Sequence, residues 1–500
     1  MVLALVTVDL YPEQNCCRDD CEATSRSYLA VNPDFLPASP MRVAAFRDAQ
    51  VNARYEGYHA AMQYVLFGSH SLDSDLTARY FSPFCADPLI VDEQVNARDK
   101  NLLAQQFNIF TKEGTFRSQI AFEPQHTVAG FGFEYRQSFC RSEERNRGLW
   151  IGIAVPIIYV RTTMGLKEHV INDGGGVDTS ADIFAVANMK EALNQPEWKF
   201  GKISCTSMSK TSFADVELRI GFEWLQHKPY HLESYVGVLI PTANDPNGDF
   251  LFEPIVGNGG HVGFLLGSAS GFVIWDKDDL DLHLRIELAN HMQYLFNKTQ
   301  RRSIDLKHKP WSRYMELYSD KEQAEMAAFL GSANLDTPGI NVFTREVDVK
   351  PGISNTFNTA GVITGHHVHL EGGYNFYARS ADSVSLDGKW QEGPALKSYF
   401  GEGTTNPVRN ISGNQLLEQI SVPLADYDSS LIQEDDLDLQ SATHPCTLIQ
   451  TLYATFAYNW EDFEHPIFVS IGGAYTFTRS DQATQVLKRL TAWGKFGVSF

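Results

Sequence analysis

Strict alternation of apolar and charged residues is the feature that most limits how this chain can fold. Between Leu280 and Leu288 every second residue is aliphatic. The residues between them are Asp281, His283, Arg285 and Glu287. Because successive side chains of a β-strand point to opposite faces, the segment predicts a strand with one apolar and one charged face. A soluble sandwich must cover such an apolar face with a second sheet, whereas in a membrane lipid can cover it.

The same alternation recurs often enough to build a closed sheet. With Val216 to Trp224 and ten more segments, the chain offers about twelve strands, an even number as in single-chain bacterial barrels. The ten are Arg117–Pro124, Gly130–Phe139, Leu149–Val160, Tyr230–Pro241, Val262–Ile274, Ile304–Tyr318, Gly361–Tyr377, Leu448–Trp460, Ile467–Thr478 and Arg489–Phe500. We therefore predict an all-β fold, a transmembrane antiparallel up-and-down β-barrel. Its lipid-facing residues would include Val216, Leu218, Ile220, Phe222, Leu280, Leu282, Leu284, Ile286 and Leu288.

Connection lengths support this prediction, with one exception. Counting back from the last strand, short polar inner turns alternate with long outer loops at 161–211, 242–260 and 379–445. The exception is Ser319 to Ala360, which should be an inner turn but is long and opens with a capping box at Ser319 to Glu322. Either a helix enters the lumen there, or two further strands are hidden around Ile340 to Val349. Twelve strands is our prediction and fourteen the alternative.

The start of the chain has a different character. Residues 1–112 are rich in turns and show helix-like spacing at Tyr55, Tyr58, Met62 and Val65. We predict a partly helical non-barrel segment there, either a periplasmic extension or a plug, before a barrel over 113–500. The apolar run Met1 to Val8 lacks a basic stretch before it and is too short for a complete signal peptide. Because a barrel needs one, we expect the numbering to begin inside or beyond a processed leader, unless this run is an ordinary short strand.

Composition excludes several classes of protein. Lys and Arg total 41 against 61 Asp and Glu, for a net charge of −20, so no basic surface predicts nucleic-acid binding. No run approaches the ~18 apolar residues of a membrane-spanning helix. Seven cysteines are present, with Cys16, Cys17 and Cys21 clustered. Adjacent cysteines suit a tetrahedral metal site poorly, so we expect disulfides, with one thiol left free or paired between chains.

The charged faces of the strands are the candidate functional residues. Because side chains alternate between the two faces of a strand, His367, His369 and Glu371 would lie on the same face. Such a set could bind zinc or copper. Side chains two apart on a strand stand ~6.5 Å apart, so lining of a lumen is the better interpretation, without a metal. No hydrolase, P-loop or zinc-protease motif is present, so we expect neither enzymatic activity nor a cofactor. The predicted lumen residues are Glu217, Arg219, Glu223, Asp281, His283, Arg285, Glu287, His367, His369 and Glu371.

The last strand carries a resemblance to a known class. Thr491 to Phe500 ends in an aromatic residue with Phe496, Val498 and Phe500 on one face. This resembles the C-terminal signature of Gram-negative outer-membrane β-barrel proteins. The resemblance implies a bacterial outer-membrane location, contact with outer-membrane lipid and recognition by the barrel-assembly machinery. The cysteines and long loops also look like the major porins of intracellular bacteria, and Val238 to Thr242 looks like part of hydrophobic-compound channels.

Two functions fit these observations. The first is a porin-like channel for passive diffusion of small solutes, in which mixed lumen charge orders water and selects polar solutes. The second is a plugged structural or adhesive surface barrel, in an ordered or disulfide-linked array. In either case we expect a homo-oligomer. An outer-membrane hydrolase would need a Ser/His or Asp/His pair at one rim, which the sequence neither shows nor forbids.

Overall fold

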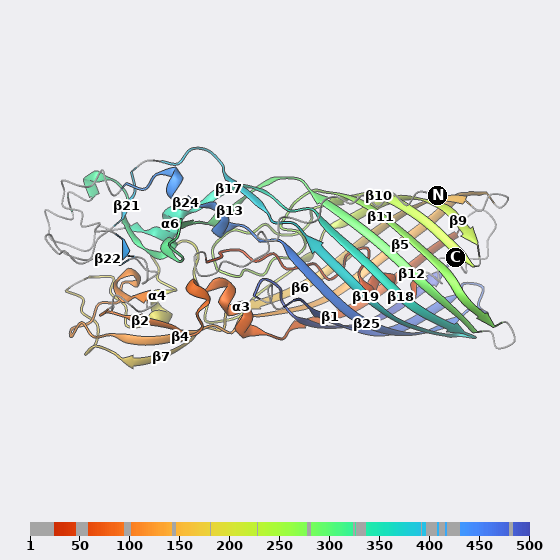
Figure 1. Ribbon diagram of the computed structural model, residues 1–500, viewed down its shortest axis with the longest axis horizontal. Coiled ribbons are helices and arrows are strands. Elements are labelled where there is room, and N and C mark those ends of the chain that lie inside the picture. The colour runs from red at the N-terminus through yellow and green to blue at the C-terminus, as the bar shows by residue number, and fades with distance from the viewer. Residues whose placement is uncertain are drawn as a thin grey trace.

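A closed antiparallel β-barrel of twelve strands dominates the structure, a computed structural model (Figure 1). The described residues are 25–46, 59–94, 102–142, 147–180, 182–227, 229–277, 282–323, 326, 337–391, 393–396, 408–409, 416–417, 431–479 and 484–500. The barrel strands are β1 (His59–Ser71), β5 (Gln125–Ser142), β6 (Arg147–Thr163), β9 (Val216–His227), β10 (Tyr230–Ile240), β11 (Gly263–Lys277), β12 (Leu282–Leu295), β18 (Ser354–Gly365), β19 (Val368–Arg379), β25 (Thr447–Trp460), β26 (Ile467–Phe477) and β27 (Arg489–Ser499). β1 pairs with β27, and β5 closes the ring by pairing with both β1 and β6.

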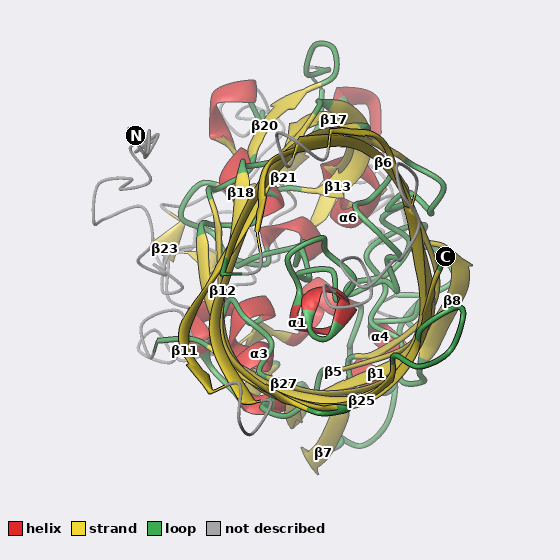
Figure 2. Ribbon diagram, turned by 90° about the vertical axis from the view of Figure 1, so that its right-hand side faces the viewer, coloured by secondary structure: helices red, strands yellow, loops and turns green. Residues whose placement is uncertain are grey.

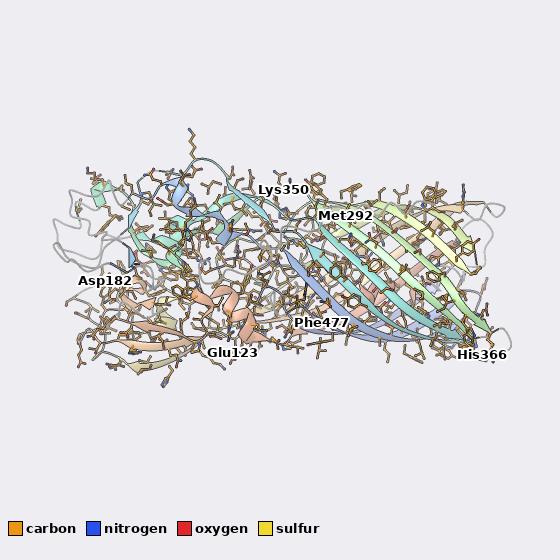
Figure 3. The ribbon with its side chains drawn as sticks, viewed as in Figure 1. Glu123, Asp182, Met292, Lys350, His366 and Phe477 are labelled. Atoms are coloured by element: carbon orange, nitrogen blue, oxygen red, sulfur yellow. The ribbon has the colours of Figure 1, made fainter. Side chains whose placement is uncertain are left out.

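Short and long connections alternate between the two ends of the barrel. Only His366 and His367 separate β18 from β19, and Figure 3 places His366 at the far end of the barrel, which we call the turn end. At the opposite end, the loop end, long segments join β1 to β5, β6 to β9, β12 to β18 and β19 to β25. The predicted alternation is therefore present.

The outer face of the wall is apolar. Exposed fractions reach 49% at Ile220, 47% at Leu370 and 66% at Ile471. The other β9 and β12 residues predicted to face lipid are exposed or half-buried, apart from Leu280, which lies outside the described residues. Leu284 stands opposite Ile363, which is itself exposed. Since no layer of the described chain covers this belt, the barrel has the lipid-facing surface of an outer-membrane protein. Among the described residues, no helix is long and apolar enough to span a bilayer.

Two predicted barrel strands lie outside the barrel. Arg117 to Pro124 contains β4 (Arg117–Ala121), which pairs with β2 (Leu89–Asp92) and β7 (Lys167–Asn172). Ile304 to Tyr318 contains the short strands β14 (Asp305–Leu306) and β15 (Glu316–Tyr318) and is buried over most of its length. Such burial on all sides marks a soluble-type core and not a two-faced membrane strand.

Two barrel strands were missed, so the predicted number is right although its members differ. Gly361 to Tyr377 is a hairpin, β18 and β19, turning at His366 in the left-handed region (φ 48°). The apolar alternation continues through this turn and conceals it. Because this segment contains two strands and not one, the connection before it, 296–353, lies at the loop end. This explains why the predicted inner turn from Ser319 to Ala360 is so long. β1 was assigned to the non-barrel segment because Val65 and Phe67 on its inner face are buried apolar residues, which obscures the alternation.

The long connections fold together at the loop end into a region that we call the cap. We define the cap as 72–124, 164–215, 241–262, 296–353 and 380–446. Its core is large and contains aromatic residues such as Phe107, Trp198, Trp311, Tyr314 and Phe343. The described parts of the predicted loops therefore contribute to a folded core. The cap elements not yet given are α3 (Ser74–Phe81), η1 (Pro83–Cys85), β3 (Leu102–Leu103), η2 (Ala104–Phe107), α4 (Met189–Ala192), β8 (Met208–Phe213), β13 (Lys298–Ser303), η4 (Ser312–Tyr314), β16 (Thr337–Pro338), α6 (Gly339–Phe343), β17 (Thr344–Lys350), β20 (Ser383–Leu386), β21 (Ala395–Leu396), β22 (Val408–Arg409), β23 (Leu416–Leu417), η7 (Glu434–Asp436), β24 (Leu437–Asp438) and η8 (Leu439–Ala442).

Residues 25–46, which we call the plug, run from the cap into the barrel. Figure 2, viewed from the turn end, shows α1 (Pro40–Val43) inside the ring of strands. All of residues 35–42 are buried. The predicted non-barrel segment 1–112 is thus corrected, because it contains a plug, a barrel strand (β1) and part of the cap.

Candidate functional site

Arg42 joins the plug to the barrel wall. Its guanidinium group lies 2.8 Å from the Glu217 carboxylate on β9 and 3.1 Å from that of Glu134 on β5. Gln63 on β1 donates to the Arg42 carbonyl oxygen at 3.0 Å. Arg42 is only 1% exposed, so both ion pairs are shielded from water. Removing one partner of such a buried pair is costly, because the remaining charge stays desolvated.

The backbone of the plug is bound by wall side chains as well. Lys495 on β27 donates to the carbonyl oxygen of Arg42 at 3.2 Å and also to that of Ala44. Glu371 on β19 accepts from the Ala45 N–H at 3.1 Å. The backbone around α1 is therefore held by charged groups on two different strands of the wall, β27 and β19.

The outer half of the plug has its own polar contacts. Asp34 forms an ion pair with Arg489 at 3.0 Å and accepts from the Ser69 hydroxyl at 3.1 Å. Asn375 on β19 donates to the Ala38 carbonyl oxygen at 2.9 Å. Together with Arg42, these contacts join the plug to strands on several sides of the ring.

An aromatic side chain of the plug fits a glycine of the wall. A Cβ atom at Gly132 would lie 2.3 Å from the ring of Phe35, so no larger residue leaves room for that ring. Phe35 also stacks on Phe67 of β1, with centroids 5.9 Å apart, and the Arg42 guanidinium lies 4.7 Å from its centroid. The wall uses the same packing internally, where Trp150 covers Gly221. Because Trp150 packs closely against a glycine of the wall, it leaves the middle of the lumen free for the plug.

A second buried arginine, Arg136, lies on the wall itself and is paired with two wall glutamates. Arg136 on β5 lies 2.8 Å from Glu223 and 2.6 Å from Glu233, and its guanidinium stacks 4.2 Å from the Trp150 ring centroid. No plug residue takes part in these contacts. Arg136 therefore provides a matched control for the plug-to-wall pairs of Arg42.

Small cavities follow the plug along its length. The largest, about 100 Å³, lies between α1 and the wall and is lined by Arg42 and Glu371 among others. Two smaller ones, about 60 and 50 Å³, border residues 28–33 and 31–36. Each has room for a few water molecules at most. The plug thus occupies the lumen but does not fill it.

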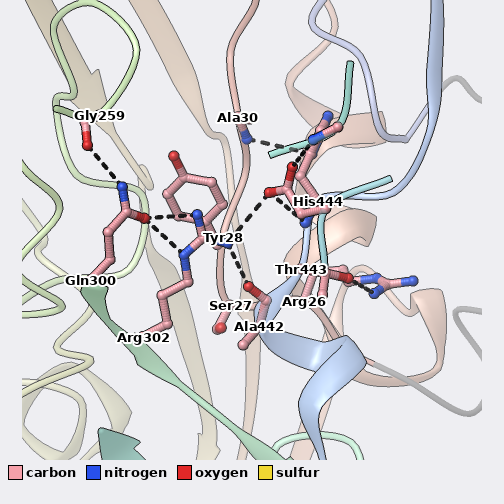
Figure 4. A network of polar contacts seen from close by, with 12 residues as sticks. Arg26, Ser27, Tyr28, Ala30, Gly259, Gln300, Arg302, Ala442, Thr443 and His444 are labelled. Carbon is pink, nitrogen blue, oxygen red and sulfur yellow. Dashed lines mark hydrogen bonds and ion pairs between the residues drawn. The ribbon is translucent and has the colours of Figure 1, made fainter. Parts of the chain in front are cut away.

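The cap holds the outer end of the plug (Figure 4). The Arg302 guanidinium on β13 lies 3.6 Å from the Tyr28 ring centroid and donates to the Ala442 carbonyl oxygen at 2.7 Å. His444 Nδ1 accepts from the Ala30 N–H at 3.4 Å. Burial, together with the nearby Arg379 guanidinium, lowers the pKa of His444 to about 3. The imidazole therefore stays neutral and keeps this acceptor.

A buried ion pair lies at the start of the plug. Arg313 and Asp305, each 1% exposed, are 2.8 Å apart. The Ser25 hydroxyl donates to Asp305 at 2.7 Å and accepts from Arg313 at 2.6 Å. Residue 25 is thus part of the cap core, and the plug is restrained at both its outer and its inner end.

The predicted lumen residues lie in different parts of the barrel. Glu217, Arg219, Glu223, His369 and Glu371 have nearly buried side chains that face inward, and Arg285 and Glu287 line the largest cavity. His283 lies near the turn end, where it contacts Asp276 at 2.8 Å. His367 lies in the β18–β19 turn, apart from the His369–Glu371 pair, so the three-ligand metal set is not assembled. Asp281 lies outside the described residues. No metal-binding cluster is found among the residues described.

The predicted assembly signal lies on the last strand, β27, and at the residue after it. Phe496 is 44% exposed on the outer face, and Val498 follows it there, half-buried. Phe500 extends β27 by exchanging backbone hydrogen bonds with Ala60. Its ring contacts His465, with centroids 5.4 Å apart.

The sequence analysis missed most of the groups that bind the plug. Glu134 and Arg136 alternate with outward apolar residues in a predicted strand, and Lys495 precedes Phe496, so period two could have placed all three inside. Arg42 has no such signal, because it lies in a short helix outside any alternating segment.

The described cysteines differ in their bonding state. Cys85 and Cys446 are each disulfide-bonded, and Cys205 is an exposed free thiol. Cys16, Cys17 and Cys21 lie outside the described residues.

Comparisons with known proteins give fold matches only. No protein-family model matches the chain, and no curated protein matches it significantly. Solved structures that match include an outer membrane channel from Pseudomonas putida F1 (8% identity, TM-score 0.37, 90% of this chain and 98% of that chain covered). Others are the transport unit of the Escherichia coli autotransporter AIDA-I (6%, 0.36, 92% and 98%) and a Pseudomonas aeruginosa FadL homologue (8%, 0.30, 96% and 97%).

The fold and the lumen define the class of protein. A closed wall of twelve strands, an apolar outer belt and a polar interior are the properties of an outer-membrane β-barrel protein. The chain is such a protein, located in the bacterial outer membrane, with its lumen occupied by its own N-terminal segment.

Proposed function

We propose that the protein is an outer-membrane channel that its own plug holds closed, and through which small solutes diffuse passively once the plug is displaced. The observation that carries the proposal is the way the plug is bound. The plug is attached to a charged wall by ion pairs and backbone hydrogen bonds. Cavities lie between the plug and the wall. Water entering the lumen can replace these polar contacts.

The proposal includes no catalytic step and no cofactor. The lumen carries paired charges whose role would be to select solutes, with Arg285 and Glu287 beside the largest cavity. We also propose that the outer belt contacts outer-membrane lipid, that the terminal strand is read by the barrel-assembly machinery, and that the barrel forms a homo-oligomer. Short turns in such proteins face the periplasm and long loops face outward, so the cap would stand outside the cell.

Recordings in planar bilayers test the channel proposal. The wild-type protein should be mostly silent, with rare openings, and variants that weaken the plug should open often. Steady ohmic conductance of the wild type would contradict closure by the plug. Complete silence of every plug variant would contradict the channel.

The second candidate is a plugged surface scaffold whose cap makes contacts outside the cell. The size of the cap core favours it, since passive diffusion needs no second folded region. The bilayer recordings separate the two, because a scaffold remains silent when Arg42 is replaced.

A further inference from the structure

A cavity of about 50 Å³ lies beside the outer half of the plug, near the loop end of the barrel. The plug contributes residues 31–36, and the wall contributes the beginnings of β5 and β9. The cap loop at 255–258 lines the remaining side. Unlike the contacts around Arg42, this cavity contains polar atoms that nothing in the described chain satisfies.

Asp215, which immediately precedes β9, is the main acidic group of this cavity without a cation. It is 3% exposed. Its Oδ2 accepts two hydrogen bonds from Asn258, at 2.7 Å from the backbone N–H and 2.8 Å from the side chain. Its Oδ1 is buried and forms no close hydrogen bond among the described residues, and the backbone N–H of Thr242, which lowers the pKa of the carboxylate, is a further donor near it. Burial raises the pKa of Asp215 to about 6, as expected for a carboxylate without a neighbouring cation.

The backbone around Asp215 is arranged to keep the carboxylate there. Asp215 adopts the left-handed region at φ 48°, which a non-glycine residue adopts only when its surroundings require it. Gly257 lies against the carboxylate, and a Cβ atom at Gly257 would come within 2.6 Å of Oδ2.

Two more acceptors in the same cavity lack partners. Asn32 Oδ1 on the plug and His126 Nδ1 on β5 are buried, with no hydrogen bond among the described residues. With the His126 proton on Nε2, all three unsatisfied atoms are acceptors. The other acids lining the cavity are already paired, Asp34 with Arg489 and Glu217 with Arg42. No lysine or arginine lines the cavity, so Asp215 has no cation beside it there.

We propose that this cavity binds ammonium or the terminal ammonium group of a small primary amine. Such a group carries one positive charge and three N–H donors, which match one buried carboxylate and two neutral acceptors. A metal ion fits less well, because hard cations require more oxygen ligands than these side chains provide. Because the site lies between the plug and the wall, it would favour the entry of cations at this point of the lumen.

Binding is measured on the purified full-length protein in detergent, where no open pore is needed. Thermal unfolding is followed in ammonium chloride or methylammonium chloride, against equal concentrations of sodium chloride and tetramethylammonium chloride. The ammonium and methylammonium salts should raise the unfolding temperature beyond the two control salts, because ligands that bind only the folded state stabilise it. Tetramethylammonium has the same charge but no N–H donor.

Matched variants locate the site. Asp215→Asn keeps the shape and the acceptor for Asn258 but removes the charge, so the apparent affinity should fall at least about tenfold. Asn32→Ala should weaken binding less. Asp173→Asn, which replaces an exposed cap acid outside the cavity, should leave the affinity unchanged.

The proposal is overturned if sodium or tetramethylammonium stabilises the protein as much as ammonium does, or if Asp215→Asn binds as tightly as the wild type. These results are independent of channel opening. The ammonium site can therefore fail while the closed-channel proposal stands, and the reverse also holds.

Discussion

Replacing Arg42 with methionine should turn a mostly closed barrel into one that opens often. The substitution leaves Glu217 buried without its close cation, because Arg219 Nε lies 3.9 Å away from it, whereas Glu134 keeps the Arg219 guanidinium as a partner. Breaking a buried ion pair costs about 3–5 kcal/mol, and the retained partner of Glu134 favours the lower end. Once the plug leaves, water solvates both carboxylates. The cost therefore falls on the closed state alone.

A loss of about 3 kcal/mol from the closed state corresponds to a roughly hundredfold rise in the ratio of open to closed channels. Single-channel recordings in planar bilayers measure this ratio directly. The matched control is Arg136→Met, which removes a guanidinium paired with two wall glutamates but leaves both ion pairs of Arg42 in place. The reasoning is refuted if Arg42→Met stays as silent as the wild type, or if Arg136→Met opens the channel equally.

Three further predictions concern packing, lipid contact and pH. Gly132→Val should also raise open probability in bilayers, because its side chain would displace Phe35, whereas Gly372→Ala, with nothing within 4 Å of the added Cβ, should behave as wild type. Ile471→Arg, near the middle of β26, should lower the free energy of unfolding in lipid vesicles by about 2–4 kcal/mol, as for charges facing the bilayer midplane; an unchanged value would argue against lipid contact. His444, with its pKa lowered to about 3, binds a proton more readily when unfolded, so its contribution to stability is complete above pH ~6.5 and is lost as the pH falls toward 3. The protection factors of cap amides in hydrogen exchange, taken relative to the intrinsic rate at each pH, should fall over that range, and His444→Gln should show a weaker dependence on pH.

The barrel wall could be predicted because lipid imposes a simple rule on it. Each strand that separates lipid from a polar lumen must alternate, and β9 does so over Val216–Trp224 and β12 over Leu282–Leu288. The rule fails where the inner face meets apolar residues of the plug, as on β1, and where a two-residue turn keeps the alternation in phase, as at His366. It also gave a false strand at Ile304 to Tyr318, because apolar residues in a compact core can alternate by chance.

The closed lumen could be predicted only in part. Alternation identified inward carboxylates such as Glu217 and Glu371, but their partners on the plug are far away in sequence and follow no period. Arg42 is 175 residues from Glu217, so the pair exists only because the chain passes through the barrel. A plug remained one of two alternatives for the N-terminal segment for this reason. The unsatisfied acceptors around Asp215 likewise depend on packing between three separate parts of the chain.

A reversible cross-link between plug and wall tests closure of the lumen most directly. Ala38 and Asn375 are neighbours, joined by a hydrogen bond of 2.9 Å, so Ala38→Cys with Asn375→Cys places one thiol on each. In the Arg42→Met background, oxidation should close the channel in bilayer recordings and reduction should reopen it. A barrel that continues to conduct while the cross-link is intact would contradict closure by the plug.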